Sequence, residues 1–484
     1  MEDTEKDLHS EFESESAQTY IDDNFEEVIE IQGDIETEDK KARRNLIVSL
    51  TWPSLAENIL MSLMQMADMM MVGGLGTDAI AGVGLVSQPR FLMMSAFQAL
   101  NIGTTALVAR CRGARDQEGA TTAFCQALLI STILTAIIGA VMLYFCEPLI
   151  RFVAGKELSE GVIREGITYF RIQIYGIPTM SLTMCMNAAL RGAGNTRAAF
   201  YNNSVANTIN VFLNYCLIFG NLGFPRMGVA GASLATVIGQ FVGLCMVAFV
   251  VAGGKYYLSF NLKKLLRTDL SMIRRIVKIG IPALLEQLIM RVGSIWFTTI
   301  ATALGDMAYA AHMIAMNIQM LSWTSGMAFG VAATTLVGQC LGRSRPDLAK
   351  EYVRMTQNLG YFVSTFIGIT LFTIGRTLSG LYSTDLIIIG LAADMLRIVA
   401  LTNPVINARL VYVSALRGAG DARFMAVVTF IGVLLVRPLL SLLLTRVFHM
   451  GLTGLWIALV TDSFICYVIT IVRYRQGKWV SIKV

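Results

Sequence analysis

The most constraining feature of the sequence is a series of long apolar runs separated by short polar connections. A helix needs about 20 apolar residues to cross a bilayer, and unbroken runs of that length exclude the shorter alternating strands of membrane β-barrels. The chain therefore predicts an all-α integral membrane protein of about twelve transmembrane helices. The expected spans are roughly 46–76, 79–109, 119–146, 166–190, 198–220, 228–252, 276–304, 308–338, 354–382, 388–416, 424–448 and 451–472.

The second half of the chain repeats the first. Glu57 recurs as Glu286 at an offset of 229, and the hexapeptide ALRGAG at 189–194 recurs at 415–420, at an offset of 226. Each repeat carries six spans, and an even number of spans preserves the orientation of a repeat in the membrane. We therefore expect two pseudo-symmetric six-helix bundles around a central cleft, the arrangement in which bundles rock around a site between or within them.

Charge is distributed unevenly along the chain. The net charge is +5, yet 16 of the 34 acidic residues lie within residues 2–39, with Lys6 as the single base among them. A segment this charged favours disorder, and it lacks the basic start and apolar core of a secretory signal. The predicted organisation is a disordered cytoplasmic leader (1–44), an N-terminal bundle (45–253), a basic cytoplasmic linker (254–275), a C-terminal bundle (276–473) and a cytoplasmic tail (474–484).

Lysine and arginine collect after every second span, as at 110–115, 191–197 and 343–354. The positive-inside rule places these connections and both termini in the cytoplasm. We therefore expect a multi-pass protein of the plasma or inner membrane. Its expected partner is the lipid bilayer, and we expect a monomer. The bases are spread over short loops and form no single patch, so a nucleic-acid partner is not expected.

Carboxylates inside the first span define a candidate site. Glu57 and Asp68 lie eleven residues apart, about three helical turns, so both project from one face. A charge near mid-membrane is costly and usually faces a cavity or a partner, which makes Asp68 a candidate coupling residue. A structural bond to a neighbouring helix is the alternative. Glu57 and its counterpart Glu286 could pair with basic residues, or could line the cleft and attract cationic substrates.

The fifth span carries a polar stripe. Asn203, Asn207, Asn210 and Asn214 follow the spacing i, i+4, i+7 and i+11, and so share one helix face. Unpaired amides in lipid are costly, so this face must meet protein or water. We expect a polar pocket beside Asp68. Amides that only tie helices together are the alternative.

The C-terminal half does not duplicate this carboxylate, since Phe297 stands at the position equivalent to Asp68 at the offset of 229. It carries Arg437 in the eleventh span and Asp462 in the twelfth, and we expect a structural ion pair because either charge alone would be costly.

Prolines inside apolar runs remove a backbone donor and are expected to bend their helices. These prolines are Pro53, Pro178, Pro282 and Pro404.

Residue types that build metal centres or enzyme active sites are scattered. The three histidines and eight cysteines are dispersed, and no Cys-x-x-Cys pair occurs. No nucleophile with a neighbouring base and no phosphate-binding loop is recognisable. We therefore expect no enzyme, no cofactor and no metal centre, apart from a coupling ion.

Four motifs recur at fixed intervals between about residues 45 and 478. They are the spacing from Pro53 through Asp68 to Val72 and Gly73, the Leu-Arg-Gly-x-Gly repeats at Leu190 and Leu416, the segment Asn210–Asn214, and the small-residue run Gly228–Thr236. Together these motifs resemble the bacterial MATE (multidrug and toxic compound extrusion) transporters. The resemblance implies two six-helix lobes around a V-shaped cleft, with entry of Na⁺ or H⁺ driving the export of amphipathic, often cationic compounds.

Matched residue by residue, the resemblance implies an ion-coupling or substrate site at Asp68, Asn210, Asn214 and Thr236. Many members of the family have aspartate where this chain has Asn214. A Na⁺ site at these four residues would therefore have one negative charge fewer than a dicarboxylate site, and hard cations prefer charged oxygen ligands. We accordingly favour H⁺ over Na⁺ as the coupling ion.

The predicted function is a cation-coupled antiporter that exports small amphipathic, cationic organic compounds by alternating access. One alternative is a flippase or exporter of lipid-linked or polyanionic intermediates, which would need a strongly cationic cavity; Arg90, Arg291 and Arg409 keep it open. Another alternative is a membrane receptor or scaffold that uses the acidic leader as its partner site.

Overall fold

The computed structural model describes residues 35–37, 39–155, 158–253, 257–260, 264–265 and 267–482. Within these residues all regular structure is helical and no strand occurs, which confirms the predicted all-α class. The described residues fall into two units, one that ends at Ser49 and one that begins at Leu50. Most of the predicted leader and part of the linker lie outside the described residues. The predicted domain boundaries stay predictions.

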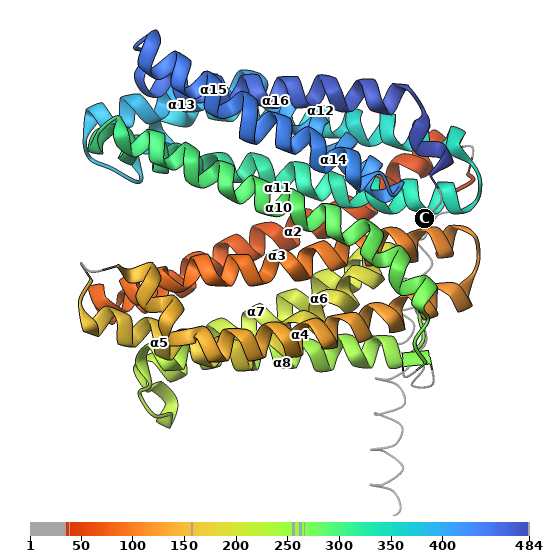
Figure 1. Cartoon of the computed structure of the whole chain (residues 1–484), viewed down its shortest axis with the longest axis horizontal. Coiled ribbons are helices and arrows are strands. Elements are labelled where there is room, and N and C mark those ends of the chain that lie inside the picture. Colours follow the sequence, from red (N-terminus) through yellow and green to blue (C-terminus); the bar gives the residue numbers. More distant parts are fainter. Residues whose placement is uncertain are drawn as a thin grey trace, which may run out of the picture. The chain divides into compact units, whose positions relative to one another are not determined.

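The described part of the first repeat contains seven helices, which Figure 1 shows in red to light green. Polar N-caps start three of them: Asp116, Ser159 and Asn195 each accept a hydrogen bond from a backbone N–H three residues on. The helices are α2 (Lys40–Gly73), α3 (Thr77–Gly113), α4 (Gln117–Ala154), α5 (Glu160–Tyr175), α6 (Ile177–Gly192), α7 (Thr196–Phe219) and α8 (Gly228–Ala252), with a short 3₁₀ turn η1 (Asn221–Gly223) between the last two.

The second repeat has the same order of long helices. Its eleventh predicted span is one continuous stretch, residues 422–447, in which α-helical and π-helical segments alternate. The elements are α10 (Leu270–Ala303), α11 (Asp306–Gly342), α12 (Pro346–Gly380), α13 (Leu386–Gly418), α14 (Ala422–Thr429), the π-helical η2 (Phe430–Val436), α15 (Arg437–Leu442), the π-helical η3 (Leu443–Val447), α16 (Gly451–Arg475) and the 3₁₀ turn η4 (Lys478–Ser481).

Nine helices of the described chain are long and apolar enough to cross a membrane. The other three predicted spans are also helical, but each is interrupted or more polar. The span 166–190 divides at Gly176 into α5 and α6, and a side chain at this glycine would come within 2.5 Å of Val237 on α8. α7 carries the asparagine stripe. α10 carries several charged residues and begins at Leu270, six residues before the predicted start of its span.

The predicted bends have different outcomes. Pro178 lies at the start of α6, directly after Gly176, and the helix is interrupted at this point. The other three prolines lie inside continuous helices. Bends at these three positions stay predictions, because the helices run through them.

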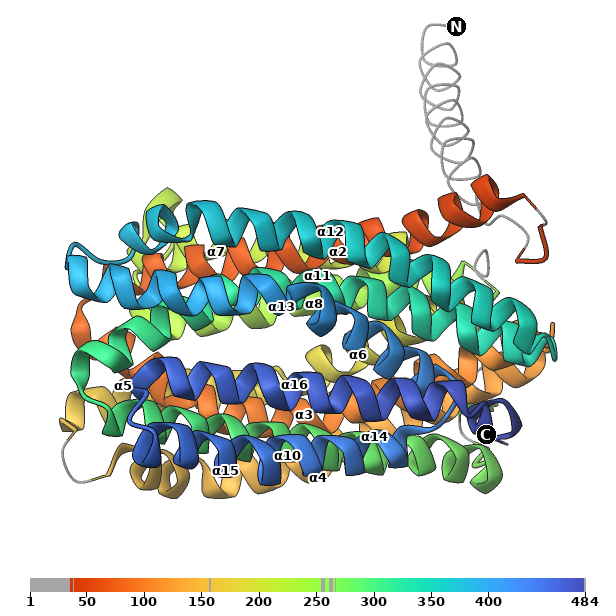
Figure 2. The same ribbon diagram turned by 90° about the horizontal axis from the view of Figure 1, so that it is seen from above.

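The two repeats form two groups of helices, here called the N-terminal bundle (α2–α8, from Leu50 onward) and the C-terminal bundle (α10–α16), and α10 packs along α3 of the first group. Figure 1 shows α3, α4, α6 and α8 on one side and α11, α12, α13 and α16 on the other, with α10 crossing between them, and Figure 2 shows the same helices from above. Each bundle has an apolar core of its own, around Phe97 and Phe170 in the first and around Phe297 and Trp456 in the second.

The bundles meet where α3 and α11 end. A side chain at Gly113 would collide with the backbone oxygen of Gln339, and a side chain at Gly342 would collide with the backbone oxygen of Arg110. Residues 110 and 113 correspond to 339 and 342 at the offset of 229. Each repeat therefore makes the same contact on the other, as expected around a two-fold axis. At the other end of the helices the bundles diverge in Figure 1; the central cleft itself stays a prediction.

Candidate ion-coupling site

Asp68 lies on α2, half-buried, with its carboxylate directed at the polar face of α7. The Asn214 side-chain nitrogen donates a hydrogen bond of 2.6 Å to Asp68 Oδ1. Arg90 on α3 lies close enough to interact electrostatically with the same carboxylate. The predicted neighbours Asp68 and Asn214 are therefore brought together by two different helices.

Asn210 and Thr236 complete this cluster. In the orientation of the Asn210 amide that satisfies its neighbours, the nitrogen donates to Asp68 Oδ1 (3.1 Å) and Oδ2 (3.3 Å). Its oxygen then accepts from the Thr236 backbone N–H (3.0 Å) and hydroxyl (3.2 Å) on α8. All four residues of the predicted site therefore form one hydrogen-bonded group across α2, α7 and α8.

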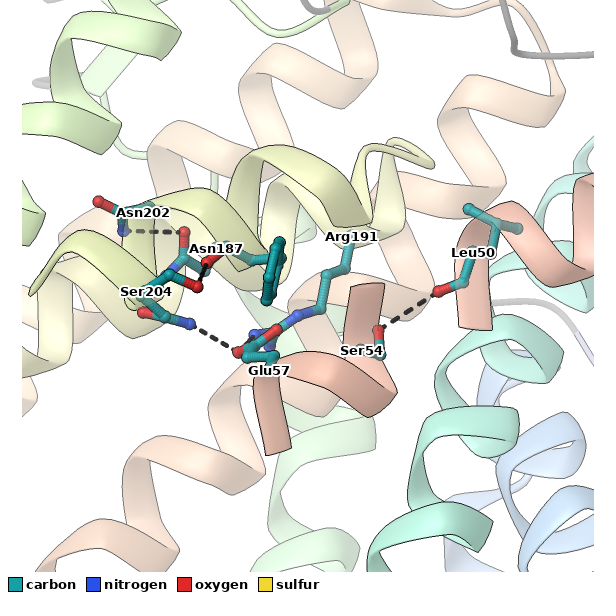
Figure 3. Close-up of polar contacts among 9 residues, drawn as sticks. Leu50, Ser54, Glu57, Asn187, Arg191, Asn202 and Ser204 are labelled. Atoms are coloured by element: carbon teal, nitrogen blue, oxygen red, sulfur yellow. Dashed lines mark hydrogen bonds and ion pairs between the residues drawn. The ribbon is translucent and has the colours of Figure 1, made fainter. Parts of the chain in front are cut away.

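A second group surrounds Glu57, which is 6% exposed. Arg191 Nη2 on α6 lies 2.5 Å from Glu57 Oε1, and Asn203 Nδ2 on α7 donates to the same oxygen at 2.6 Å. Figure 3 shows this group together with Asn187, which donates to Asn203 and accepts from Asn202. Of the two roles that the sequence left open for Glu57, this structure has the ion pair.

The asparagine stripe of α7 serves both groups. Asn203 binds Glu57, and Asn214 binds Asp68. The two asparagines are eleven residues apart on α7, and the two carboxylates are eleven residues apart on α2. α2 and α7 therefore run parallel and in register along these contacts. Asn207, which lies between the two groups, is half-buried and makes no side-chain hydrogen bond to a described residue.

The C-terminal bundle repeats the Glu57 group. Arg417 Nη2 lies 2.6 Å from Glu286 Oε1, and the Thr429 hydroxyl donates to the same oxygen at 3.2 Å. Arg417 and Thr429 correspond to Arg191 and Asn203 at the offset of 226. The carboxylate–arginine pair is thus a feature of both repeats, and a buried charge with such a partner avoids the cost of an unpaired one.

The Asp68 group has a different counterpart. The expected pair between Arg437 and Asp462 is present, with 2.5 Å between Arg437 Nε and Asp462 Oδ2. Asp462 corresponds to Thr236 at the offset of 226, and the Arg437 guanidinium lies 5.7 Å from the ring of Phe297, the residue at the position of Asp68. The C-terminal bundle therefore holds an internally neutralised pair where the N-terminal bundle holds a titratable carboxylate.

Some residues of the site were missed by sequence reasoning. Tyr169 on α5 lies beside Arg90 and Thr236, and neither Tyr169 nor Arg90 was linked to the site in advance. The partner of Glu57 could have been found, because Glu57 and Arg191 both recur in the second repeat. Across the described part of the chain, no group of three histidine, cysteine or acidic residues could hold a metal ion.

These features define a class: an all-α membrane protein of two repeats, with a hydrogen-bonded carboxylate inside one bundle, is organised as a secondary transporter. Comparison with known families identifies the transporter family. The MatE family model matches residues 53–216 and 282–443, so the chain belongs to the MATE family of transporters.

Relatives of known name agree with this assignment. The chain is 28% identical over 439 residues to the "Probable multidrug resistance protein NorM" of Thermotoga maritima, covering 90% of this chain and 93% of that protein. It is 26% identical to the "Uncharacterized transporter YisQ" of Bacillus subtilis, covering 90% and 95%. Among solved structures, a MATE transporter in complex with MaD3S superposes with a TM-score of 0.84 at 22% identity, covering 90% of this chain and 96% of that one.

Proposed function

We propose that this protein is a proton-coupled antiporter that exports small amphipathic organic compounds by alternating access, and that it is not an enzyme. The observation that carries the proposal is the Asp68 group, a carboxylate within a membrane helix that receives hydrogen bonds from two amides, one of which is held in turn by Thr236. A single titratable group is sufficient to bind and release a proton. The names of the relatives, several of which are called probable multidrug resistance proteins, support drug-like substrates.

The arrangement of the amides favours H⁺ over Na⁺. Sodium binds oxygen ligands, as hard cations do. Around Asp68, however, Asn214 and Asn210 present their nitrogens to the carboxylate. In a Na⁺ site at Asp68, Asn210, Asn214 and Thr236, the buried and unpartnered Asn214 Oδ1 could supply one ligand, but Asn210 would have to turn its oxygen toward Asp68. A proton needs no such rearrangement.

The charge of the substrate is less constrained than the sequence suggested. The argument for cationic compounds rested on three carboxylates, and two of them, Glu57 and Glu286, are held in ion pairs. Asp68 remains as the group that would attract a cation. We therefore propose cationic amphiphiles as the first class to test, with Asp68 as the point where substrate and proton compete.

We infer that the end at which α3 and α11 meet faces the cytoplasm, with both termini on that side of the plasma or inner membrane. The basic connections that follow these two helices, residues 110–115 and 343–354, support this orientation through the positive-inside rule. We also propose that the protein acts as a monomer.

The test is efflux of a cationic dye from energised vesicles under separately imposed proton and sodium gradients. The proton gradient alone should drive efflux, and Asp68→Asn should abolish it while the protein remains inserted. Efflux that requires sodium and does not respond to a proton gradient would overturn the proton assignment.

One observation favours a second substrate class, anionic or lipid-linked compounds. The ion pairs of the described residues do not include Arg90, Arg291 or Arg409. Arg291 instead contacts Gln88 and lies 4.6 Å from the ring of Phe91, both on α3 of the other bundle. An anionic amphiphile tested beside the cationic dye distinguishes the two classes.

A further inference from the structure

The contact between the bundles includes two side-chain hydrogen bonds, and both donors lie on α11 of the C-terminal bundle. On α11, the Thr335 hydroxyl donates to the backbone oxygen of Arg191 at 3.0 Å, and Gln339 Nε2 donates to the backbone oxygen of Gly192 at 3.2 Å. Thr335 is fully buried and Gln339 is 4% exposed. The two acceptors lie at the end of α6, and the Arg191 oxygen also accepts from the Gly194 backbone N–H at 2.9 Å. We call these two bonds the α11–α6 latch.

The equivalent latch from α3 to the second repeat is absent among the described residues. Position 335 corresponds to Ala106, which has no side-chain donor, and position 339 corresponds to Arg110. Arg110 Nη1 instead donates to the backbone oxygen of Ile482 at 2.9 Å. The backbone contacts between α3 and α11 are therefore the same in both directions, but only α11 supplies the side-chain donors of the latch.

The latch is linked to the helix that carries the candidate coupling residue. The side chain of Arg191, whose backbone receives the Thr335 bond, is held by Glu57 of α2 at 2.5 Å. Asp68 lies eleven residues further along the same helix. A displacement of α2 that carries Glu57 with it would therefore pull on Arg191, the residue whose backbone oxygen receives the Thr335 bond.

We propose that Thr335 and Gln339 are positioning residues that hold the two bundles closed where α3 and α11 end, and that Glu57 couples α2 to this latch through Arg191. The proposal rests on the alternating-access function argued above. Loss of one such hydrogen bond should shift the ratio of closed to open molecules about threefold to tenfold, the range expected for a net intramolecular hydrogen bond.

The chain offers a matched control beside Thr335. The Thr334 hydroxyl donates to the backbone oxygen of Ser414 at 2.9 Å, a bond of the same kind. The two residues that this bond joins, however, both lie in the C-terminal bundle. Thr334→Val should therefore cost a similar bond without loosening the contact between bundles, whereas Thr335→Val and Gln339→Leu should loosen it.

The experiment measures the distance between spin labels at Arg115→Cys and Ser344→Cys by pulsed electron paramagnetic resonance. These exposed positions follow α3 and α11 and correspond at the offset of 229. The background carries Cys245→Ser, because Cys245 is exposed. Thr335→Val and Gln339→Leu should each move population from the short to the long distance. Thr335→Ser, which keeps the hydroxyl, should restore the original distribution.

Equal distributions in the unsubstituted background, Thr335→Val and Gln339→Leu would overturn the latch, and so would an equally large shift in Thr334→Val. The distance measurement does not depend on transport. Loss of the proposed proton coupling with a retained shift would therefore contradict the proposed function and leave the latch standing. For Glu57, Glu57→Gln should produce the same shift as Thr335→Val, and an unchanged distribution would remove Glu57 from the coupling.

Discussion

At the scale of single residues, the structure gives the carboxylates Glu57, Glu286 and Asp68 two kinds of partner. Glu57 and Glu286 are bound to arginines from the same motif in each repeat, while Asp68 is held by amides. Glu57 and Glu286 each have a bonded arginine that balances their charge, whereas the hydrogen-bond partners of Asp68 are neutral amides. This difference is the physical reason for assigning coupling to Asp68.

The substitution Asn214→Asp tests the ion preference at this scale. A second carboxylate next to Asp68 supplies the extra charged oxygen that a sodium ion favours. We expect efflux by this variant to rise with sodium at a fixed proton gradient, measured as dye efflux over a series of sodium concentrations. Asn214→Ser, which adds no charge, is the control. Equal sodium responses in both variants would contradict the argument from ligand charge.

The pair Arg437 and Asp462 permits a stability prediction. Both side chains are buried, so Asp462→Asn should lower the free energy of unfolding by about 3 kcal/mol, because it leaves an unpaired charge inside the bundle. The double substitution Arg437→Met with Asp462→Leu should recover most of this loss. Thermal unfolding in detergent provides the comparison. A double variant less stable than Asp462→Asn would contradict a purely structural role.

At the scale of helices, the apolar runs were sufficient to locate the long spans, because length and hydropathy are properties of each segment alone. A bend at Pro178 was expected, but the full division of the fourth span at Gly176 was not. Gly176 packs closely against Val237 of α8, a contact between segments about 60 residues apart that no local pattern encodes. The parallel register of α2 and α7 was likewise hidden until Asn203 and Asn214 were seen to bind Glu57 and Asp68.

The α3–α11 contact gives a prediction for glycine. A methyl group at Gly113 would collide with the backbone of Gln339, whereas a methyl group at Gly84 on the same helix would have no other atom within 4 Å. Gly113→Ala should therefore push α3 and α11 apart and increase labelling of a nearby engineered cysteine by a water-soluble maleimide. Gly84→Ala should leave this labelling unchanged. Equal labelling in both variants would show that the helices adapt without separating.

At the scale of the whole chain from Leu50 onward, the internal repeat carries most of the information. Its offsets of 229 and 226 predicted two related bundles, and the reciprocal contacts of Gly113 and Gly342 follow the same offset of 229. The site could be predicted only in part, because the repeat indicates what the halves share. The sequence showed Asp68 in one half and Phe297 in the other, but the partners that surround these two positions come from other helices and were visible only in the structure.

Alternating access makes a prediction for the ends where the bundles diverge. Thr77 and Asp306, corresponding exposed residues at the starts of α3 and α11, can be replaced by cysteines and joined by bifunctional reagents of graded length. Short reagents should stop dye efflux by preventing separation, and long reagents should allow it. Undiminished efflux by fully cross-linked protein at every length would contradict movement of the bundles against each other.

The exchange of a proton for substrate is the central claim, and it can be measured directly in sodium-free proteoliposomes that contain a pH-sensitive dye. An outward substrate gradient should draw protons inward and acidify the lumen, and Asp68→Asn should abolish this acidification in protein that is correctly folded and inserted. The contrary result would be outward movement of substrate with no change of internal pH, or acidification that persists undiminished in Asp68→Asn.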